Sequence, residues 1–331
     1  MRTLVTGGTG FVGSNIVSRF AALGNDVVAM DTTPPDGQLE RFWKSEADRI
    51  RFIQADVTDG QLVGKILDDE NIDSVVHAAA ITSQTSPDSL SHLLRVNLVG
   101  SVSVLDAALE VPSVRRLVCI SSGIVYGPSS EGQAIPEDFT LVPTGPYAVS
   151  KYMSETLARY AATGAQFQTA VLRLGWVYGP MERPTSSRSR MSTIWELCHH
   201  ALAGQEIRIN NVDATRDWVH SMDVAGATYA ALRLPDLSHS VLNVSGGRGF
   251  TTQEVLQLLK EEIPGLRWLQ TPEARANIIV NTRNRRGHLD IRQLLQTTEF
   301  TPTFDLRSGL RAYVKWLRDP KGEEWQQESH K

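Results

Sequence analysis

The chain has 331 residues, 41% of them hydrophobic, which is enough apolar material for one large α/β domain or for such a domain with a smaller one. Its formal net charge of −4, without a basic stripe, argues against a nucleic acid or an anionic membrane as the main partner. No apolar run approaches the roughly 18 residues of a membrane span, and the only cysteines, Cys119 and Cys198, belong to no metal-spaced cluster, so we expect no membrane, no metal and a cytoplasmic location.

The first half of the chain alternates short β-branched runs with helical patterns. Six runs have the composition of strands: RTLVTG, DVVAMD, RIRFIQAD, DSVVHAAA, VRRLVCISS and FQTAVLRL. Strands that alternate with helices are typical of βαβ units, so we predict an α/β fold with a doubly wound, Rossmann-type parallel sheet. We expect this nucleotide-binding domain to cover residues 1–173.

A glycine pattern follows the first predicted strand, in VTGGTGFVGSNI. Gly7, Gly10 and Gly13 lie at the mouth of the first helix, and Gly8, Gly10 and Gly13 satisfy G-x-G-x-x-G. Glycines at this spacing allow a tight turn and a close approach of the backbone to a pyrophosphate, which the helix N-terminus binds. Because a strand precedes the loop and a helix follows it, we predict a dinucleotide site with these contacts: Gly7, Gly10, Phe11, Val12 and Gly13.

Asp31 ends the second predicted strand. A carboxylate at this point accepts hydrogen bonds from the ribose hydroxyls of adenosine and repels a 2′-phosphate. Thr32 and Thr33 follow it, and no Arg is there to bind that phosphate, so the sequence favours NAD over NADP as the cofactor. Asp56, in QADVTD with Val57 beside it, is either a turn acid or an adenine contact.

The segment GPYAVSKYMSE, residues 145–155, predicts a helix because Pro146 suits a first turn and helix-forming residues follow. Tyr147 and Lys151 then lie one turn apart on the same face. A free Tyr has a pKa of about 10, but a nearby cation favours the phenolate and lowers that pKa toward a working range. Taken alone, the pair also fits a helix whose Tyr packs on the core while its Lys extends to water.

The second half of the chain has a looser pattern. GPMERPTSSRSR, residues 179–190, has no apolar periodicity and predicts a mobile loop, either an exposed connector or a substrate lid. Helices are predicted at 192–204, at 251–263 with Thr251 or Thr252 as the N-cap, and at 305–319, before a frayed tail at 321–331. We expect a smaller substrate lobe formed by 174–211 and 245–331, with 212–244 returning to the first domain.

Taken together, these segments resemble the extended short-chain dehydrogenase/reductase family, the group that contains nucleotide-sugar epimerases and dehydratases. TGGTGFVG, VVHAAA, RVNLVGSVSVLDAA, CISSGIVYG, PYAVSK, LRLGWVYGP, TRDWVHSMDVAGA and LNVSGG follow one another in the family's order, so the resemblance covers nearly the whole chain. It implies an NAD-dependent enzyme that acts on a secondary hydroxyl of a sugar or nucleotide sugar. It also implies a homodimer packed through the helices that hold Asn97 and Tyr147.

The resemblance implies a role for each matching residue. Tyr147 is the expected general acid/base, Lys151 binds the nicotinamide ribose and lowers the pKa of the Tyr, and Ser122 holds the reacting oxygen. The further cofactor contacts that it implies are Ala78, Ala79, Ala80 and Asn97, of which Asn97 fits a structural role equally well, and His77 is expected to be scaffold. The substrate contacts that it implies are Thr82, Ser122, Gly175, Arg216 and Arg286.

The chain departs from the family pattern in two places. Gly123 and Ile124 stand where sugar 4,6-dehydratases carry an acid pair that eliminates water, and where related decarboxylases carry a Glu at the second position. Neither residue transfers a proton, so neither dehydration nor decarboxylation is expected. At Gly175 the resemblance implies an Asn that helps to hold the diphosphate of the substrate, and its absence weakens the case for a nucleotide-linked substrate.

The anion that the two arginines bind is left open by the sequence. Arg216 matches a family Arg that contacts the diphosphate, and Arg286 offers a second cation, although either could pair with a surface carboxylate or bind a free sugar acid. The leading interpretation is an NAD-dependent epimerase or oxidoreductase of a sugar or nucleotide sugar. The alternative is an NAD-dependent dehydrogenase of a free sugar acid or another small hydroxy or keto compound. Asp217 and Asp223 are expected to be structural.

Overall fold

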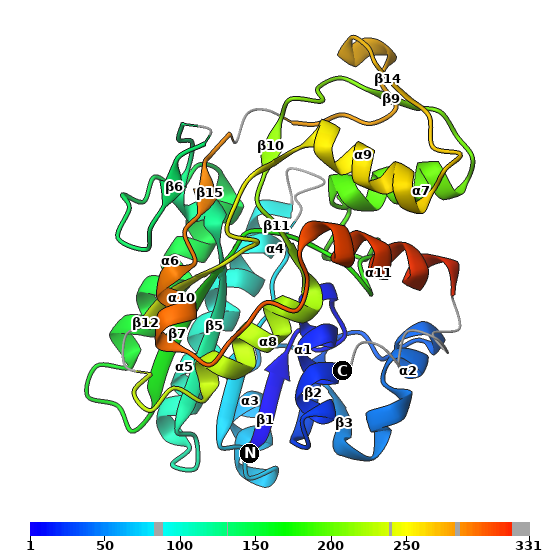
Figure 1. Cartoon of the computed structure of the whole chain (residues 1–331). Helices are drawn as coiled ribbons and strands as arrows, with labels where there is room; N and C mark the ends of the chain where they lie inside the picture. The colour runs from blue at the N-terminus through cyan, green and yellow to red at the C-terminus, as the bar shows by residue number, and fades with distance from the viewer. Residues whose placement is uncertain (83–88, 131, 238–239, 282–284, 320–331) are drawn as a thin grey trace.

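The computed structural model describes residues 1–82, 89–130, 132–237, 240–281 and 285–319 of the chain (Figure 1). The tail that the sequence predicts to be frayed, 321–331, lies outside these described residues.

A seven-stranded sheet forms the centre of the molecule, in the order β12-β7-β5-β4-β1-β2-β3. Its strands are β1 (Arg2–Thr6), β2 (Asp26–Asp31), β3 (Ile50–Gln54), β4 (Ser74–His77), β5 (Arg116–Ser122), β7 (Gln168–Leu174) and β12 (Ser240–Val244). Every neighbouring pair is parallel, which confirms the predicted doubly wound sheet. The strand order reverses between β1 and β4, and ligands of such sheets bind in the crevice at the carboxyl ends of the strands at that point.

Helices cover both faces of this sheet (Figure 1). The helices α1 (Phe11–Ala22) and α8 (Ser221–Leu232) pack together on one face, and α3 (Gly60–Asp69), α5 (Gly100–Glu110) and α6 (Pro146–Ala161) pack on the other. The shorter helices of the chain are α2 (Gly37–Phe42), α4 (Ser89–Leu94) and α10 (Arg292–Thr297). A π-helical turn, η2 (Arg95–Val99), joins α4 to α5. With both faces covered, the second lobe packs at the carboxyl edge of the sheet (Figure 1).

The later helices form largely where the sequence predicts them, because each has a side-chain cap. They are α7 (Thr193–Leu202), α9 (Thr252–Glu262) and α11 (Leu306–Arg318). Ser192 caps α7, and Asp305 caps α11. Thr251 caps α9 and forms a capping box with Glu254, which settles the choice between Thr251 and Thr252.

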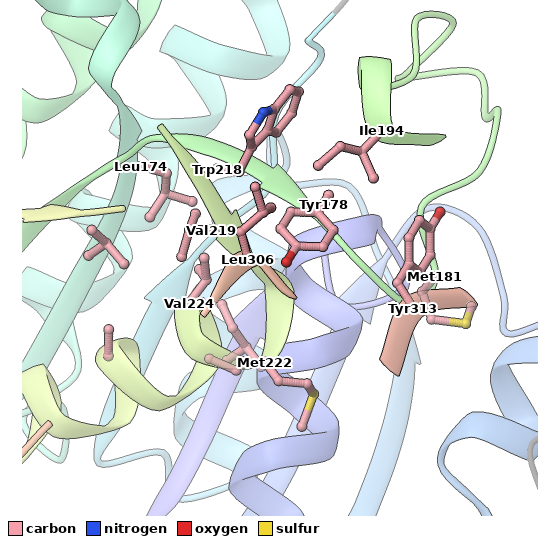
Figure 2. Close-up of a cluster of buried hydrophobic side chains, with 14 of the residues drawn as sticks. Leu174, Tyr178, Met181, Ile194, Trp218, Val219, Met222, Val224, Leu306 and Tyr313 are labelled. Carbon is pink, nitrogen blue, oxygen red and sulfur yellow. The ribbon is translucent and has the colours of Figure 1, made fainter. Parts of the chain in front are cut away.

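Short strand pairs complete the second lobe above the carboxyl edge of the sheet (Figure 1). They are β8 (Trp176–Tyr178) with β11 (Trp218–His220), β9 (Ile207–Ile209) with β14 (Trp268–Gln270), β10 (Thr215–Arg216) with β13 (Phe250–Thr251), and β6 (Ala134–Ile135) with β15 (His288–Leu289). One buried apolar cluster runs from the α1 face of the sheet into this lobe. Figure 2 shows its middle, where Tyr178, Trp218 and Val219 meet Leu306 and Tyr313 of α11. The lobe is therefore held to the sheet by a continuous core.

One segment meets the length and hydropathy expected of a membrane span, which the sequence analysis did not single out. The helix Leu90–Glu110, made of α4, η2 and α5, has 21 residues with a mean hydropathy of 1.3 in its most apolar window. It packs against α3 and α6 in the helical layer, and residues such as Leu93, Val104 and Ala108 are fully buried there. A helix that packs on a sheet needs the same composition, so length and hydropathy alone are weak evidence for a membrane.

Candidate active site

A cleft of about 1370 Å³ lies between the carboxyl edge of the sheet and the second lobe. The residues that the sequence predicts for the site and that line this cleft are Gly7, Gly10, Phe11, Val12, Gly13, Asp31, Asp56, Val57, Ala78, Ala79, Ala80, Thr82, Ser122, Tyr147, Lys151, Gly175, Arg216 and Arg286. The cleft is larger than a single small-molecule pocket, which spans roughly 300 to 1,000 Å³. It therefore has room for two ligands side by side.

The glycine loop is packed so closely that side chains are excluded from it. Gly7 has φ of +67°, and a Cβ added there would lie 2.7 Å from the Cα of Ala79. A Cβ at Gly13 would lie 2.0 Å from the carbonyl oxygen of Gly7. The start of α1 thus rests directly on the turn before it, as the close approach of a pyrophosphate to the backbone requires.

The N-terminus of α1 has no side-chain cap. Ser14 donates the first intrahelical bond, to the carbonyl oxygen of Gly10 at 2.9 Å, so the N–H groups of Phe11, Val12 and Gly13 face the cleft end without a helical acceptor. Such N–H groups, together with the helix dipole, bind phosphate oxygens. This part of the chain fits the pyrophosphate of a dinucleotide.

Two acids lie at the opposite end of the loop. Asp31 accepts the N–H groups of Thr9 at 3.2 Å and Thr33 at 3.3 Å, which fixes its carboxylate beside the glycine loop. Asp56 receives both the N–H and the hydroxyl of Thr58 on Oδ1, each at 2.9 Å, and it also lines the cleft. Asp56 therefore acts as a turn acid and also lines the cleft, so both roles considered for it from the sequence are compatible with its position.

Ser122 and Tyr147 meet at the middle of the cleft. Ser122 is the last residue of β5, and Tyr147 is in the first turn of α6, which begins after Gly145. Both side chains line the cleft. Burial raises the pKa of Tyr147 to about 12, while the charge of Arg188 and the hydroxyl of Ser122 act to lower it.

Lys151 lies one turn further along α6 and is buried. Its ammonium donates to the carbonyl oxygen of Ile120 at 2.8 Å, and burial lowers its pKa. The sequence analysis expects Lys151 to depress the pKa of Tyr147, whereas the cation that does so in this structure is Arg188. Arg188 comes from the loop 179–190, and the spacing of residues in the sequence contains no signal that brings it to Tyr147.

A buried ion pair holds α6 against the sheet beneath these residues. Arg173 donates to Glu155 through Nη2 at 2.7 Å and Nε at 3.2 Å, and Ser121 donates to Glu155 at 2.8 Å. Because Ser121 precedes Ser122 and Glu155 lies one turn after Lys151, this contact fixes the strand and the helix that carry the two hydroxyls.

Asn97, expected among the cofactor contacts, does not line the cleft. Its side chain accepts the N–H of Ile81 at 2.7 Å and donates to the carbonyl oxygen of Ile81 and to Ser150, each at 3.0 Å. Asn97 therefore fixes the segment Ala80–Ile81, which lines the cleft, from the side that faces away from the cleft. Its side-chain amide is bound to the backbone of Ile81 and to Ser150. His77 is buried between Thr6 and Ser101, and burial lowers its pKa to about 3, as expected of scaffold.

The substrate end of the cleft is built around Arg286 and Asp217. Arg286 Nη2 lies 3.0 Å from Asp217 Oδ1 and Nη1 lies 3.1 Å from Oδ2, and both side chains are buried. An added Cβ at Gly123 would lie 3.0 Å from Arg286 Nη2, and one at Gly175 would lie 3.0 Å from Asp217 Oδ2. The ion pair thus occupies the space that side chains at these two glycines would need.

Gly175 has no side chain that could contact a ligand, but the next residue, Trp176, does. Trp176 lines the cleft, and the guanidinium of Arg216 stacks on its ring at 4.7 Å from the centroid. Arg216 also donates to the carbonyl oxygens of Thr215 at 2.8 Å and Asn281 at 2.5 Å. The sequence analysis did not single out Trp176, because an apolar, β-like context carries no signal of a ligand contact.

The loop 179–190, which the sequence predicts to be mobile, makes contacts at several points. Arg183 pairs with Asp36 at 2.8 Å, the buried Glu182 accepts the hydroxyl of Ser192 at 2.7 Å, and Ser187 accepts the N–H of Thr82 at 3.0 Å. Several of its residues line the cleft, so it is more than an exposed connector. The loop crosses from the Asp31 end of the cleft to the Ser122 end.

Known proteins resemble this chain in sequence and in fold. A sequence model of the NAD dependent epimerase/dehydratase family matches residues 3–245. The UDP-glucose 4-epimerase of Mycolicibacterium smegmatis is 33% identical over 323 residues, which covers 96% of this chain and 99% of that protein.

Two solved structures have the same fold over almost their whole length. The UDP-glucose 4-epimerase of Thermotoga maritima, with UDP-glucose, is 25% identical, has a TM-score of 0.83, and is matched over 96% of this chain and 99% of its own. MoeE5, in complex with UDP-glucuronic acid and NAD, is 30% identical, has a TM-score of 0.79, and is matched over the same shares.

Proposed function

The chain belongs to the NAD-dependent epimerase/dehydratase family, and on that premise we propose that it inverts a secondary hydroxyl of a nucleotide sugar through Ser122, Tyr147 and Lys151. It is an enzyme of the extended short-chain dehydrogenase/reductase type with NAD as its cofactor. The observation that carries the proposal is that Ser122, Tyr147 and Lys151 line the same cleft as the glycine loop, where the Ser122 hydroxyl acts to lower the pKa of Tyr147.

Each residue of the trio has a distinct task in this proposal. The Tyr147 oxygen takes the proton of the substrate hydroxyl, and Ser122 holds the substrate oxygen in line. Lys151, whose ammonium also donates to the carbonyl oxygen of Ile120, binds the nicotinamide ribose in this proposal. When bound, NAD accepts the hydride from the carbinol carbon, and its positive ring favours the phenolate of Tyr147. For inversion, bound NAD would supply the same hydride to the opposite face of the sugar carbon, and Tyr147 would return its proton to the substrate oxygen.

Epimerisation is favoured over dehydration by the residues after Ser122. Gly123 and Ile124 carry no group that transfers a proton, and Arg286 fills the space where a side chain at 123 would stand. The similarity to enzymes of UDP-sugars favours a nucleotide-linked substrate, despite the doubt raised by Gly175. The arginines that line this half of the cleft, Arg188, Arg190, Arg216 and Arg286, suit an anionic substrate.

A substrate panel tests this proposal. The purified protein is incubated with NAD and UDP-, GDP- and dTDP-hexoses, beside free uronic and aldonic acids, while NADH absorbance and product stereochemistry are followed. We expect inversion of a nucleotide sugar at C4 without accumulation of NADH, because the hydride leaves and returns within one turnover. Accumulation of NADH with free sugar acids alone would refute the proposal in favour of a dehydrogenase.

We also propose that two copies of the chain pack through Leu90–Glu110 and α6. Both helices expose apolar side chains, namely Val99, Val102, Val149, Tyr152 and Met153, each between 37% and 50% exposed. A second copy would cover this patch with its own identical patch, as a two-fold interface requires. We propose that the protein works in the cytoplasm, since it needs no oxidising compartment for its two buried free cysteines.

Sedimentation of the full chain tests the dimer. Wild type is expected at the mass of two chains at micromolar concentration, and the double variant Val99→Glu with Met153→Glu at the mass of one. Leu295→Glu, on α10, replaces a Leu of similar exposure outside the patch and should leave the mass unchanged. A monomeric wild type would contradict the proposal.

A further inference from the structure

The guanidinium of Arg188 is paired with a buried carboxylate. Its Nη2 donates to Glu182 Oε1, and the side chain of Glu182 is completely buried. Glu182 also accepts the N–H of Ser192 at 2.6 Å and the hydroxyl of Ser192 at 2.7 Å, so the carboxylate is fixed independently of Arg188. Arg188 lines the cleft, whereas Glu182 does not. The ion pair therefore presents its positive end to the cleft.

The same guanidinium has donors that its surroundings do not use. A guanidinium carries five N–H donors. Within the described parts of the chain, Glu182 is the only acceptor for the side-chain donors of Arg188, and the Nε–H is buried without an acceptor. A buried N–H that lacks an acceptor is costly, so such groups in native structures call for a specific explanation. Beside a cleft, the explanation that fits is a ligand that brings acceptor atoms.

The neighbours of Arg188 place it at the boundary between the cofactor end and the substrate end of the cleft. Its guanidinium carbon lies over the ring of Phe11, 5.2 Å from the centroid. Phe11 is the first residue of α1, and its N–H is one of the three without a helical acceptor. Ser187, the residue before Arg188, accepts the N–H of Thr82, which also lines the cleft. On the other side, the charge of Arg188 acts on Tyr147.

A closed turn fixes the loop at this point. Arg188 donates its N–H to the carbonyl oxygen of Thr185 at 3.2 Å and to the hydroxyl of Thr185 at 3.1 Å. Thr185 donates its own N–H to the carbonyl oxygen of Arg188 at 2.9 Å. Earlier in the loop, Arg183 pairs with Asp36 at 2.8 Å. Arg188 is therefore carried by a segment that is bound to the fold before it, at Arg183, and through its own pair with Glu182.

We propose that Arg188 binds the pyrophosphate of NAD, together with the free N–H groups at the start of α1. The inference rests on the glycine loop as the site of the pyrophosphate. A dinucleotide with its adenosine at Asp31 and its nicotinamide at Tyr147 has its pyrophosphate between these two points, and Arg188 lies in that interval beside Phe11. The parallel N–H groups of a guanidinium match two phosphate oxygens. No acid in the first turn of α1 competes for this anion site.

Calorimetric titration of the full chain with NAD alone tests the proposal without any turnover. Arg188→Gln should weaken NAD binding by about tenfold to hundredfold, the range expected for hydrogen bonds to a charged group. Arg188→Lys should lose only part of this affinity, because it keeps the positive charge and lacks the paired N–H groups. Arg267→Gln, at an exposed arginine that does not line the cleft, is the matched control and should bind NAD as wild type does. If Arg188→Gln fails to fold, the Lys variant carries the test.

Fragments of the cofactor show which of its groups Arg188 binds. ADP-ribose carries the pyrophosphate, and adenosine does not. Arg188→Gln should weaken binding of ADP-ribose by the same factor as binding of NAD, and it should leave binding of adenosine unchanged. UDP, added to the protein already saturated with NAD, is the probe for the other diphosphate that could reach this cleft. Its affinity should not change in Arg188→Gln.

The outcomes separate this inference from the cofactor site on which it rests. Wild-type affinity for NAD in both Arg188 variants would overturn the inference and leave the glycine-loop site standing. An equal loss for adenosine and ADP-ribose would also overturn it, because the change would then act on the shape of the cleft. A loss confined to UDP would assign Arg188 to the substrate instead. Normal NAD binding by Gly13→Val would remove the glycine-loop site and the inference with it.

Discussion

The two halves of the cleft are lined by different kinds of groups, backbone in one half and side chains in the other. The half that we propose to hold NAD is built on the backbone of one short stretch, Gly7–Gly13, where close packing excludes a side chain at Gly7 and at Gly13. The half that we propose to bind the sugar is made of side chains from distant segments, such as Arg188, Asp217 and Arg286. A backbone site is visible in a sequence as glycine spacing, whereas a side-chain site becomes visible only once the segments are folded together.

The largest effect is expected where the two halves meet, at Tyr147. Tyr147→Phe removes the hydroxyl that transfers the proton and should lower turnover by about 10² to 10⁴, the usual contribution of a positioned general base. NAD affinity should change little, because the ring remains. Tyr160→Phe, on the same helix and 78% exposed, is the control and should be as active as wild type. Undiminished turnover in Tyr147→Phe would remove this residue from the mechanism.

A change in the backbone half should damage cofactor binding alone. Gly13→Val places a Cβ 2.0 Å from the carbonyl oxygen of Gly7, so we expect NAD affinity to fall at least about a hundredfold from overpacking of about 3 kcal/mol. Gly24→Ala, at the other end of α1 in open space with φ of +83°, should cost about 1–2 kcal/mol of stability and leave NAD affinity unchanged. Titration calorimetry and thermal unfolding measure the two quantities. Normal NAD binding by Gly13→Val would show that the loop does not hold the pyrophosphate.

A change in the side-chain half should damage substrate binding alone. An Asn at Gly175 brings a Cβ to 2.8 Å from the carbonyl oxygen of Asp217 and from the Cβ of Ser245, which disturbs the partner of Arg286. We expect about a tenfold rise in KM from roughly 1–3 kcal/mol of overpacking, with NAD affinity intact. Steady-state kinetics beside NAD titration checks this, and an improved KM would show that an Asn is useful at this position.

The smallest expected effect is a shift of the pH profile. Arg188 lowers the pKa of Tyr147, which burial raises to about 12, so Arg188→Gln should raise that pKa further. Because Tyr147 accepts a proton only as the phenolate, the rise of kcat/KM with pH should move to higher pH in this variant. Arg183→Gln, in the same loop but paired with Asp36, should not move it. Profiles measured between pH 6 and 10 that coincide for wild type and Arg188→Gln would contradict this role.

The parts of the molecule that sequence predicts well are those whose physical requirement is local. The parallel sheet, the helix that carries Tyr147 and Lys151, and the Thr251 cap each depend on residues within a few positions of one another. The position of Asn97 next to the segment Ala80–Ile81 depends on its hydrogen bonds to Ile81 and Ser150, which lie 16 and 53 residues away in the sequence. Hydrogen bonds of this range leave no periodicity in the chain, so the cofactor-contact interpretation of Asn97 had no local signal against it.

Arg188 and the loop 179–190 illustrate the same limit. A segment rich in Pro, Ser and Arg predicts mobility, because its composition carries no information on partners outside the segment. Its order comes from Asp36, Thr82 and Ser192, each in a different part of the fold. No sequence motif could therefore predict that the positive charge of Arg188 lies near Tyr147.

The π-helical turn Arg95–Val99 fixes how many residues this part of the chain must have. The carbonyl oxygen of Asn97 within it accepts the hydroxyls of Ser101 at 2.6 Å and of Ser154, on α6, at 2.8 Å. Successive residues of an α-helix are rotated by about 100°, so deleting one residue here would rotate α4 by that angle relative to α5. Such a deletion would turn Asn97 away from Ile81 and Ser154 away from its acceptor. The number of residues in this turn is therefore constrained by the contacts on both sides of it. Relatives with the same contacts should tolerate substitutions at the surface of the turn, but they should not tolerate insertions or deletions within it.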